Sequence, residues 1–266
     1  MPFSAPTEPT AAFLQGEIWL HRGQYQHARR CFEQALAEER LQGDAQRLLP
    51  VLINLGNACA VLGDHAAARA AYLELLEQQR LADHPDDRAI GDALANLGNL
   101  SRERGETSRA GAYYLEAADR LERGGDAYSL GILYSNIALL QQQTGAVAQA
   151  IETYQRAIEL HKRCGHEAGL AATWGRLGRA FVAVAQDRSA ETCFNYAYSH
   201  FNRLADADGQ AEALRALAQI YAGRGDAERA SACRQRVVET FRGYGIAVPE
   251  ADARRLDDPD TRVRPA

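Results

Sequence analysis

The chain has 266 residues, of which 46% are hydrophobic and 24% charged, and it carries a net charge of −5 at pH 7. This balance argues against the basic surface expected of a partner for nucleic acid or an anionic membrane. The first ten residues, MPFSAPTEPT, have neither the basic start nor the apolar run of a signal peptide or membrane span. We therefore expect a protein of the cytoplasm, or a piece of something larger.

One pattern of small residues recurs along the whole chain. Each copy begins with a small residue and continues with Gly at +7, Ala at +12, an aromatic ring at +16 and Ala or an aliphatic residue at +19. The leading residues are Gly16, Gly56, Gly98, Ala138, Gly178 and Ala218, separated by 40, 42, 40, 40 and 40 residues. Ala185 replaces the +7 glycine in the fifth copy, and Arg234 replaces the ring in the sixth. A fixed period of this length indicates stacked supersecondary units.

Each copy predicts a pair of antiparallel helices. In the second copy, Leu55, Ala58, Cys59 and Leu62 recur at steps of three and four, which is helical spacing. Gly63 then predicts a helix end and Asp64 an N-cap for the next helix. The small residues at the leading and +12 positions allow the two helices to cross closely, and the ring fills the space beside them.

In chain order, the pattern predicts an all-α solenoid of six helix pairs in one domain. We expect a flexible lead at residues 1–9, and a solenoid over residues 10–243. Its repeats are expected at about 10–43, 44–84, 85–125, 126–165, 166–206 and 207–243. Residues 244–266 are expected to form a short capping segment, with a helix over 249–256, and a flexible tail.

The fifth copy carries a family resemblance. Trp174, Leu177, Gly178 and Phe181, followed by Ala190 and Phe194, resemble the tetratricopeptide repeat (TPR) pattern W-x2-L-G-x2-Y, A-x3-F. The 40-residue period and the missing proline at the end of each unit are similar to the long-repeat subclass found in kinesin light chains, spindle-orienting scaffold proteins and bacterial regulatory ATPases. The resemblance implies a right-handed superhelix that binds proteins.

No catalytic, cofactor or metal signature is present in the sequence. It contains no G-x-S-x-G elbow, phosphate-binding loop, H-E-x-x-H or dinucleotide fingerprint, so we expect no enzyme activity and no cofactor. The string from His161 through Cys164 to His166 has no second ligand pair, so we expect an ordinary helix end there and no metal.

The residues flanking each leading position are the candidate binding residues. Residues two before and one after it lie three apart on the first helix of each pair, on the face that lines the concave side of such a solenoid. With Arg102 and Arg215 added to the same side, ten residues, here called the groove residues, are predicted to bind a ligand. They are Asn54, Asn57, Asn96, Asn99, Arg102, Asn136, Arg176, Arg179, Arg215 and Gln219.

These side chains suggest a peptide ligand. Asparagine amides both donate and accept, so they suit the backbone of an extended peptide, as the resemblance also implies, while Arg176 and Arg179 would select an acidic side chain or a C-terminal carboxylate. The alternative is that the asparagines make bonds within and between repeats and the arginines form a solvated face. The leading hypothesis is a cytoplasmic adaptor that captures an extended, acidic protein segment. The second is a regulatory receptor or oligomerising scaffold that acts through its ends or convex face.

Overall fold

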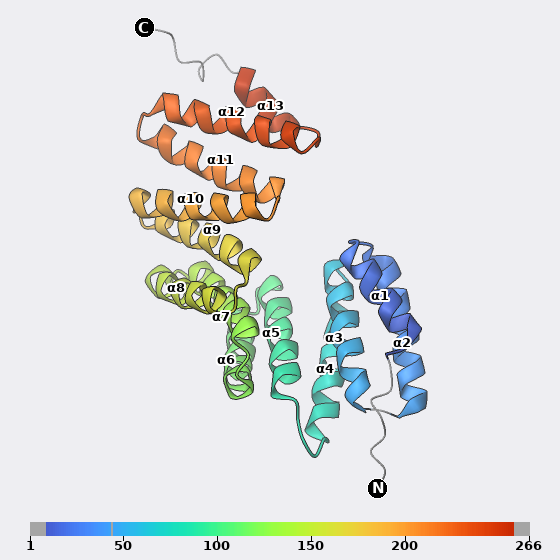
Figure 1. Ribbon diagram of the computed structural model, residues 1–266. Helices are drawn as coiled ribbons and strands as arrows, with labels where there is room; N and C mark the ends of the chain where they lie inside the picture. Colours follow the sequence, from blue (N-terminus) through green and yellow to red (C-terminus); the bar gives the residue numbers. More distant parts are fainter. Residues whose placement is uncertain (1–8, 44, 258–266) are drawn as a thin grey trace. The chain divides into compact units, whose positions relative to one another are not determined.

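A computed structural model describes residues 9–43 and 45–257, and the expected flexible lead and tail fall mostly outside them (Figure 1). The described residues form thirteen helices and no strand. The helices are α1 (Ala11–His21), α2 (Tyr25–Gln42), α3 (Ala45–Val61), α4 (His65–Arg80), α5 (Asp87–Glu103), α6 (Thr107–Gly124), α7 (Ala127–Gln143), α8 (Val147–Arg163), α9 (Glu167–Ala183), α10 (Asp187–Arg203), α11 (Ala207–Gly223), α12 (Ala227–Gly243) and α13 (Glu250–Asp257). The prediction of an all-α chain of six helix pairs is confirmed.

The chain divides into two compact units, Met1–Ser129 and Leu130–Ala266, and the division falls within α7. In unit 1, each of the helices α1 to α5 packs against the helix that follows it. In unit 2, the helices from α8 to α13 do the same. No helix in these described parts of the chain is long and apolar enough to cross a bilayer.

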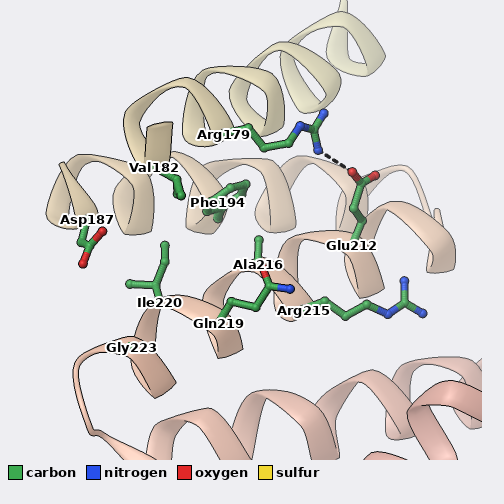
Figure 2. A pocket seen from close by; sticks show the side chains of 10 residues that line it. All are labelled: Arg179, Val182, Asp187, Phe194, Glu212, Arg215, Ala216, Gln219, Ile220 and Gly223. Atoms are coloured by element: carbon green, nitrogen blue, oxygen red, sulfur yellow. Dashed lines mark hydrogen bonds and ion pairs between the residues drawn. The ribbon is translucent and has the colours of Figure 1, made fainter. Parts of the chain in front are cut away.

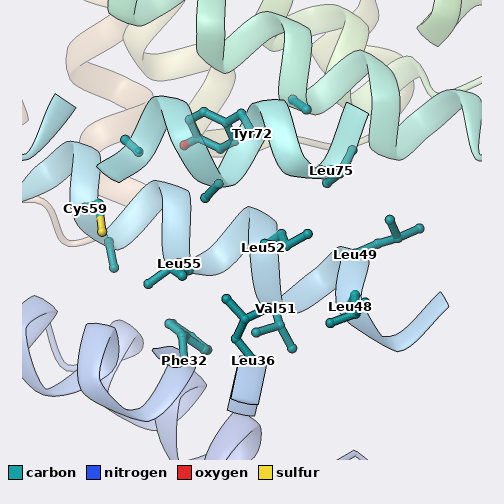
Figure 3. Close-up of a cluster of buried hydrophobic side chains, with 14 of the residues drawn as sticks. Phe32, Leu36, Leu48, Leu49, Val51, Leu52, Leu55, Cys59, Tyr72 and Leu75 are labelled. Atoms are coloured by element: carbon teal, nitrogen blue, oxygen red, sulfur yellow. The ribbon is translucent and has the colours of Figure 1, made fainter. Parts of the chain in front are cut away.

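The core of unit 1 shows why the leading residue of each repeat is small. A Cβ placed on Gly56 would lie 2.4 Å from Cε1 of Tyr72, and one on Gly16 would lie 2.5 Å from Cε1 of Phe32. Both rings are buried, and they belong to one apolar cluster that also includes Leu52 and Leu75 (Figure 3). The glycine therefore makes room for the ring sixteen residues later, as the repeat pattern predicts.

Unit 2 repeats this arrangement around Tyr154 and Phe194, which are both buried. A Cβ on Gly178 would lie 2.9 Å from the ring of Phe194. The turn between α9 and α10 keeps the left-handed conformation although it lacks glycine, because Ala185 has φ of 55°.

Each unit contains one of the two tryptophans of the chain. In unit 1, the ring centroid of Trp19 lies 5.0 Å from that of His27. In unit 2, Trp174 stacks on Tyr196 with centroids 4.8 Å apart, and the Lys162 ammonium lies 6.0 Å from the Trp174 ring. The aromatic surroundings of the two indoles are therefore different.

Candidate functional site

The ten groove residues are divided equally between the two units. Unit 1 contains Asn54, Asn57, Asn96, Asn99 and Arg102, and unit 2 contains the rest.

In unit 1, the asparagines after the leading glycines bind tyrosines. The Tyr72 hydroxyl donates to Oδ1 of Asn57 over 2.7 Å, and the Tyr114 hydroxyl donates to Oδ1 of Asn99 over 2.8 Å. Asn96 also donates to Oδ1 of Asn57, over 3.1 Å, which links two neighbouring repeats. These amide oxygens satisfy phenol groups that are otherwise buried, so part of the asparagine pattern has an internal role.

Asn54 lies beside an acidic cavity in unit 1. This cavity, of about 360 Å³, is formed between α1, α3 and α5, and its charged lining residues are Glu17, Asp86, Arg88 and Asp92. Burial raises the pKa of the Asp92 carboxyl group. With three carboxyl groups and one guanidinium at its wall, this cavity does not suit an acidic ligand.

Arg102 does not contribute a free guanidinium to unit 1. Its side chain is only 16% exposed, and its nearest acidic group is Glu103, at 3.8 Å. Nε of Arg102 makes no hydrogen bond to any residue that the structure describes.

Unit 2 brings four groove residues together around two adjoining cavities. The larger one, here called the arginine cavity, has a volume of about 430 Å³, and the smaller one has about 200 Å³. The arginine cavity is lined by Arg179, Val182, Asp187, Phe194, Glu212, Arg215, Ala216, Gln219, Ile220 and Gly223 (Figure 2). Arg176 lines the smaller cavity, which shares Arg179, Phe194 and Glu212 with the larger one. Helices α9, α10 and α11 therefore build one candidate site of two neighbouring cavities with an apolar floor and charged edges.

Arg176 is held by polar groups of the preceding repeat. Its Nη1 donates to the Ser135 hydroxyl over 3.0 Å and lies 3.4 Å from Oδ1 of Asn136. Ser135 in turn lies 3.2 Å from the Thr173 hydroxyl. This buried network fixes the direction of the Arg176 side chain.

Arg179 is paired with Glu212 across the edge of the arginine cavity. Figure 2 shows the two side chains, from α9 and α11, pointing toward one another, and Nη1 donates to Oε1 of Glu212. The Arg179 side chain is 49% exposed and that of Glu212 is 62% exposed. Exposed pairs of this kind contribute about 0–1 kcal/mol, so the pair can open at little cost.

Arg215 has a stronger partner. Both Nε and Nη2 donate to the Asp252 carboxylate, with 3.0 Å from Nε to Oδ1, and the Asp252 side chain is only 7% exposed. This interaction raises the pKa of the Arg215 guanidinium. The two hydrogen bonds form a bidentate pair, in which two N–H groups of the guanidinium bind the two oxygens of one carboxylate.

Sequence reasoning missed Glu212 and Asp252, the carboxylates that engage two of the predicted arginines. Glu212 lies 33 residues after Arg179, on the first helix of the next repeat, so the repeat period could have indicated it. Asp252 lies on α13, outside the repeats, and no repeat register indicates its position.

Another polar contact in unit 2 joins two histidines. Nδ1 of His161 lies 3.2 Å from Nδ1 of His166, and the rings meet edge to face. Burial, His166 and the charge of Arg176 lower the pKa of His161 to about 4. Within residues 9–43 and 45–257, no group of three or more His, Cys, Asp or Glu side chains is placed to hold a metal ion.

Comparison with known proteins identifies the repeat. A family profile described as tetratricopeptide repeat matches residues 133–168, which include most of α7, all of α8 and the first two residues of α9. A search of curated proteins found no match.

Several solved structures are similar in fold. BtubC (BKLC) from P. vanneervenii is 18% identical, with a TM-score of 0.70 over 91% of this chain and 95% of that chain. A signal transduction ATPase with a tetratricopeptide repeat sensor, from Pyrococcus horikoshii, is 15% identical, with a TM-score of 0.76 over 93% of this chain and 38% of that one. The Cut9–Hcn1 tetramer of the APC/C is 18% identical, with a TM-score of 0.69 over 92% of this chain and 41% of that one. At these identities the likeness concerns the fold.

Proposed function

We propose that this chain, whose residues 133–168 match a tetratricopeptide-repeat profile and whose fold is similar to solved repeat structures, is a non-catalytic adaptor that binds an extended, acidic segment of a protein partner in unit 2. TPR repeats generally serve protein–protein interaction, and the groove residues of α9 and α11 give this chain its specific surface. The observation that carries the proposal is the arginine cavity, where an exposed guanidinium lies beside an apolar floor.

The arginine cavity favours an apolar side chain next to a carboxylate. Val182, Phe194 and Ile220 form its apolar floor. A volume of about 430 Å³ lies within the range of pockets that hold small ligands, and it accommodates a leucine or phenylalanine side chain together with adjacent backbone. The amide of Gln219, at the same wall, has the donors and acceptor needed to bind peptide backbone.

The carboxylate of the partner would replace Glu212 as the counter-charge of Arg179. Because the Arg179–Glu212 pair is mostly exposed, breaking it costs little, and the new pair would form at the edge of a cavity that the ligand has closed to water. Arg176, directed by Ser135, adds a second positive charge at the adjoining cavity. The acidic cavity of unit 1 is excluded from this proposal because its charge would repel the same ligand.

The proposal is tested by selecting peptides from a random library of twelve-residue sequences displayed on phage. Selection on the wild-type chain is expected to enrich Asp or Glu next to an apolar residue. The tightest peptide, labelled with fluorescein, should bind the Arg179→Glu variant at least about ten-fold more weakly, because attraction becomes repulsion. Glu212→Gln should bind it about two- to five-fold more tightly, because Arg179 loses its internal partner.

Arg188→Glu is the matched control. Arg188 lies on α10 of the same unit, is exposed, and lines neither unit 2 cavity, so the same charge reversal should leave affinity unchanged. Circular dichroism verifies that all variants are folded. Equal binding by wild type and Arg179→Glu, or enrichment of peptides without acidic residues, would overturn the assignment and leave the ends or convex face as the binding surface.

A further inference from the structure

Arg215 is the groove residue whose partner lies outside the six repeats. Asp252, on α13, accepts two hydrogen bonds from its guanidinium, and the same guanidinium lies 5.9 Å from the ring of Phe241. Arg215 also lines the arginine cavity, near the negative charge of Glu212. One side chain therefore belongs both to the candidate site and to the attachment of α13.

The attachment of α13 depends on few contacts. The helix has eight residues, which is too short to be stable by itself in water. Val248, just before it, packs against an apolar cluster that includes Leu214 and Phe241, and α13 packs on α12. Within the described part of α13, Asp252 is the buried side chain, and its ion pair with Arg215 joins the helix to α11.

We propose that α13 is a latch in which Asp252 acts as an internal competitor for the ligand carboxylate at Arg215. This inference rests on the function proposed above and adds its regulation. When an acidic segment enters the arginine cavity with one carboxylate on Arg179, a second carboxylate of the segment competes with Asp252 for the Arg215 guanidinium. Binding of the segment and release of α13 are therefore coupled.

The coupling follows from the burial of Asp252. If Arg215 turns to the ligand, a carboxylate that is 7% exposed loses its counter-charge. An unpaired buried charge is strongly unfavourable, so α13 must move to let Asp252 reach water. By linkage, release of α13 strengthens ligand binding by the same factor by which bound ligand favours release of α13.

The test uses the full chain, the labelled library peptide and the Asp252→Asn variant. Removing the charge at position 252 should raise the affinity for the peptide by about 5- to 10-fold and speed amide hydrogen exchange across α13. In the wild type, saturating peptide should also speed exchange across α13. The matched control is Glu250→Gln, since Glu250 lies on the same helix, is exposed and pairs with Arg254, and it should change neither quantity.

A second variant separates a latch from a merely structural contact. Arg215→Gln should speed exchange across α13 as Asp252→Asn does, but it should weaken peptide binding because the shared guanidinium is lost. Exchange across α13 that is unchanged or slower on peptide binding would overturn the latch, as would an affinity for Asp252→Asn no higher than that of the wild type. If the wild type selects no acidic peptide, the proposed function fails and the latch fails with it. Peptide binding that depends on Arg179 but not on Asp252 overturns the latch alone.

Discussion

At the scale of single residues, the asparagines of the first helices have two different roles. Asn57 and Asn99 accept hydrogen bonds from the tyrosine of their own helix pair, whereas the Asn54 side chain makes no hydrogen bond to the residues that the structure describes. The same residue type at neighbouring groove positions therefore stabilises the fold in one case and faces an open cavity in the other.

This difference predicts unequal costs of substitution. Asn57→Ala should lower the free energy of unfolding by about 1–3 kcal/mol, because the hydroxyl group of Tyr72 loses its hydrogen-bond acceptor. Tyr72 is only 1% exposed, so water cannot replace that acceptor. Tyr72→Phe should cost less, about 1 kcal/mol, since the half-buried Asn57 amide can still reach water. Asn54→Ala serves as the control and should change stability by less than about 0.5 kcal/mol. Urea unfolding measures all three, and equal costs for Asn54→Ala and Asn57→Ala would contradict the assigned roles.

At the scale of the element, the connection between α8 and α9 contains a titratable contact. His161, in the last turn of α8, is 1% exposed, and the backbones of Gly131 and Gly169 approach its ring closely. His166, before α9, faces it, and Arg176 adds a positive charge on the α9 side. A proton on either ring would bring a second positive charge into this space.

The contact predicts a loss of stability in mild acid. The folded state lowers the pKa of His161 to about 4 from an ordinary value of 6.5, so the unfolded chain binds a proton at a higher pH than the folded chain does. Stability should be complete above pH 6.5 and should fall as pH decreases from 6.5 toward 4. Between pH 7 and pH 5 the loss from this group should be roughly 2 kcal/mol, measured by urea unfolding at each pH.

His161→Leu should remove that part of the pH dependence, because the buried side chain can then no longer bind a proton. His84→Gln is the control, since His84 is exposed in the connection between α4 and α5, and it should keep the full dependence. A wild-type chain equally stable at pH 5 and pH 7 would contradict the prediction.

The helix pairs could be predicted from the sequence because their signals are local and repeated. Gly63 and Asp64 mark one helix end and the next helix start, and the structure ends α3 at Val61 and begins α4 at His65. The period placed Arg176 and Arg179 on the first helix of their pair, where they line adjoining cavities. These features depend on spacing along one or two helices.

The contacts of the site could not be predicted in the same way. Whether Arg179 meets Glu212, and whether Asn57 meets Tyr72, depends on side-chain rotamers and on how one helix pair is rotated against the next. The contact of Asp252 with Arg215 depends on where a non-repeated segment folds back. Spacing determines which face a residue lies on, but it does not determine what that residue touches there.

At the scale of the whole molecule, charge is distributed unequally between the two units. Unit 1 has 13 basic and 19 acidic residues, for a net charge of −6, and unit 2 has 17 and 16, for a net charge of +1. The cavities follow this difference, because the unit 1 cavity has three carboxylates and one guanidinium, while the arginine cavity has two of each. Although the whole chain has a net charge of −5, unit 2 by itself is close to neutral and can therefore accept an acidic ligand.

The packing of consecutive helices predicts that damage stays local. Phe32→Ala, at a fully buried ring of α2, should cost about 3–5 kcal/mol and speed amide exchange mainly in α1, α2 and α3, because each helix of unit 1 contacts chiefly its neighbours. Leu121→Ala, at a buried residue of α6, should instead speed amide exchange most in α5 and α6 and least in α1 and α2. Hydrogen exchange with mass spectrometry measures both, and a uniform rise from α1 to α6 would show instead that unit 1 opens as one block.

The placement of Trp19 and Trp174 gives the chain two separate optical reporters. Trp19→Phe leaves a tryptophan emission that comes only from unit 2, and Trp174→Phe leaves one that comes only from unit 1. Trp174 lies in the same repeat as Arg176 and Arg179, so its fluorescence can follow peptide binding, while Trp19 supplies an internal reference. A single titration with the two variants can thus assign a bound partner to one half of the protein without any attached dye.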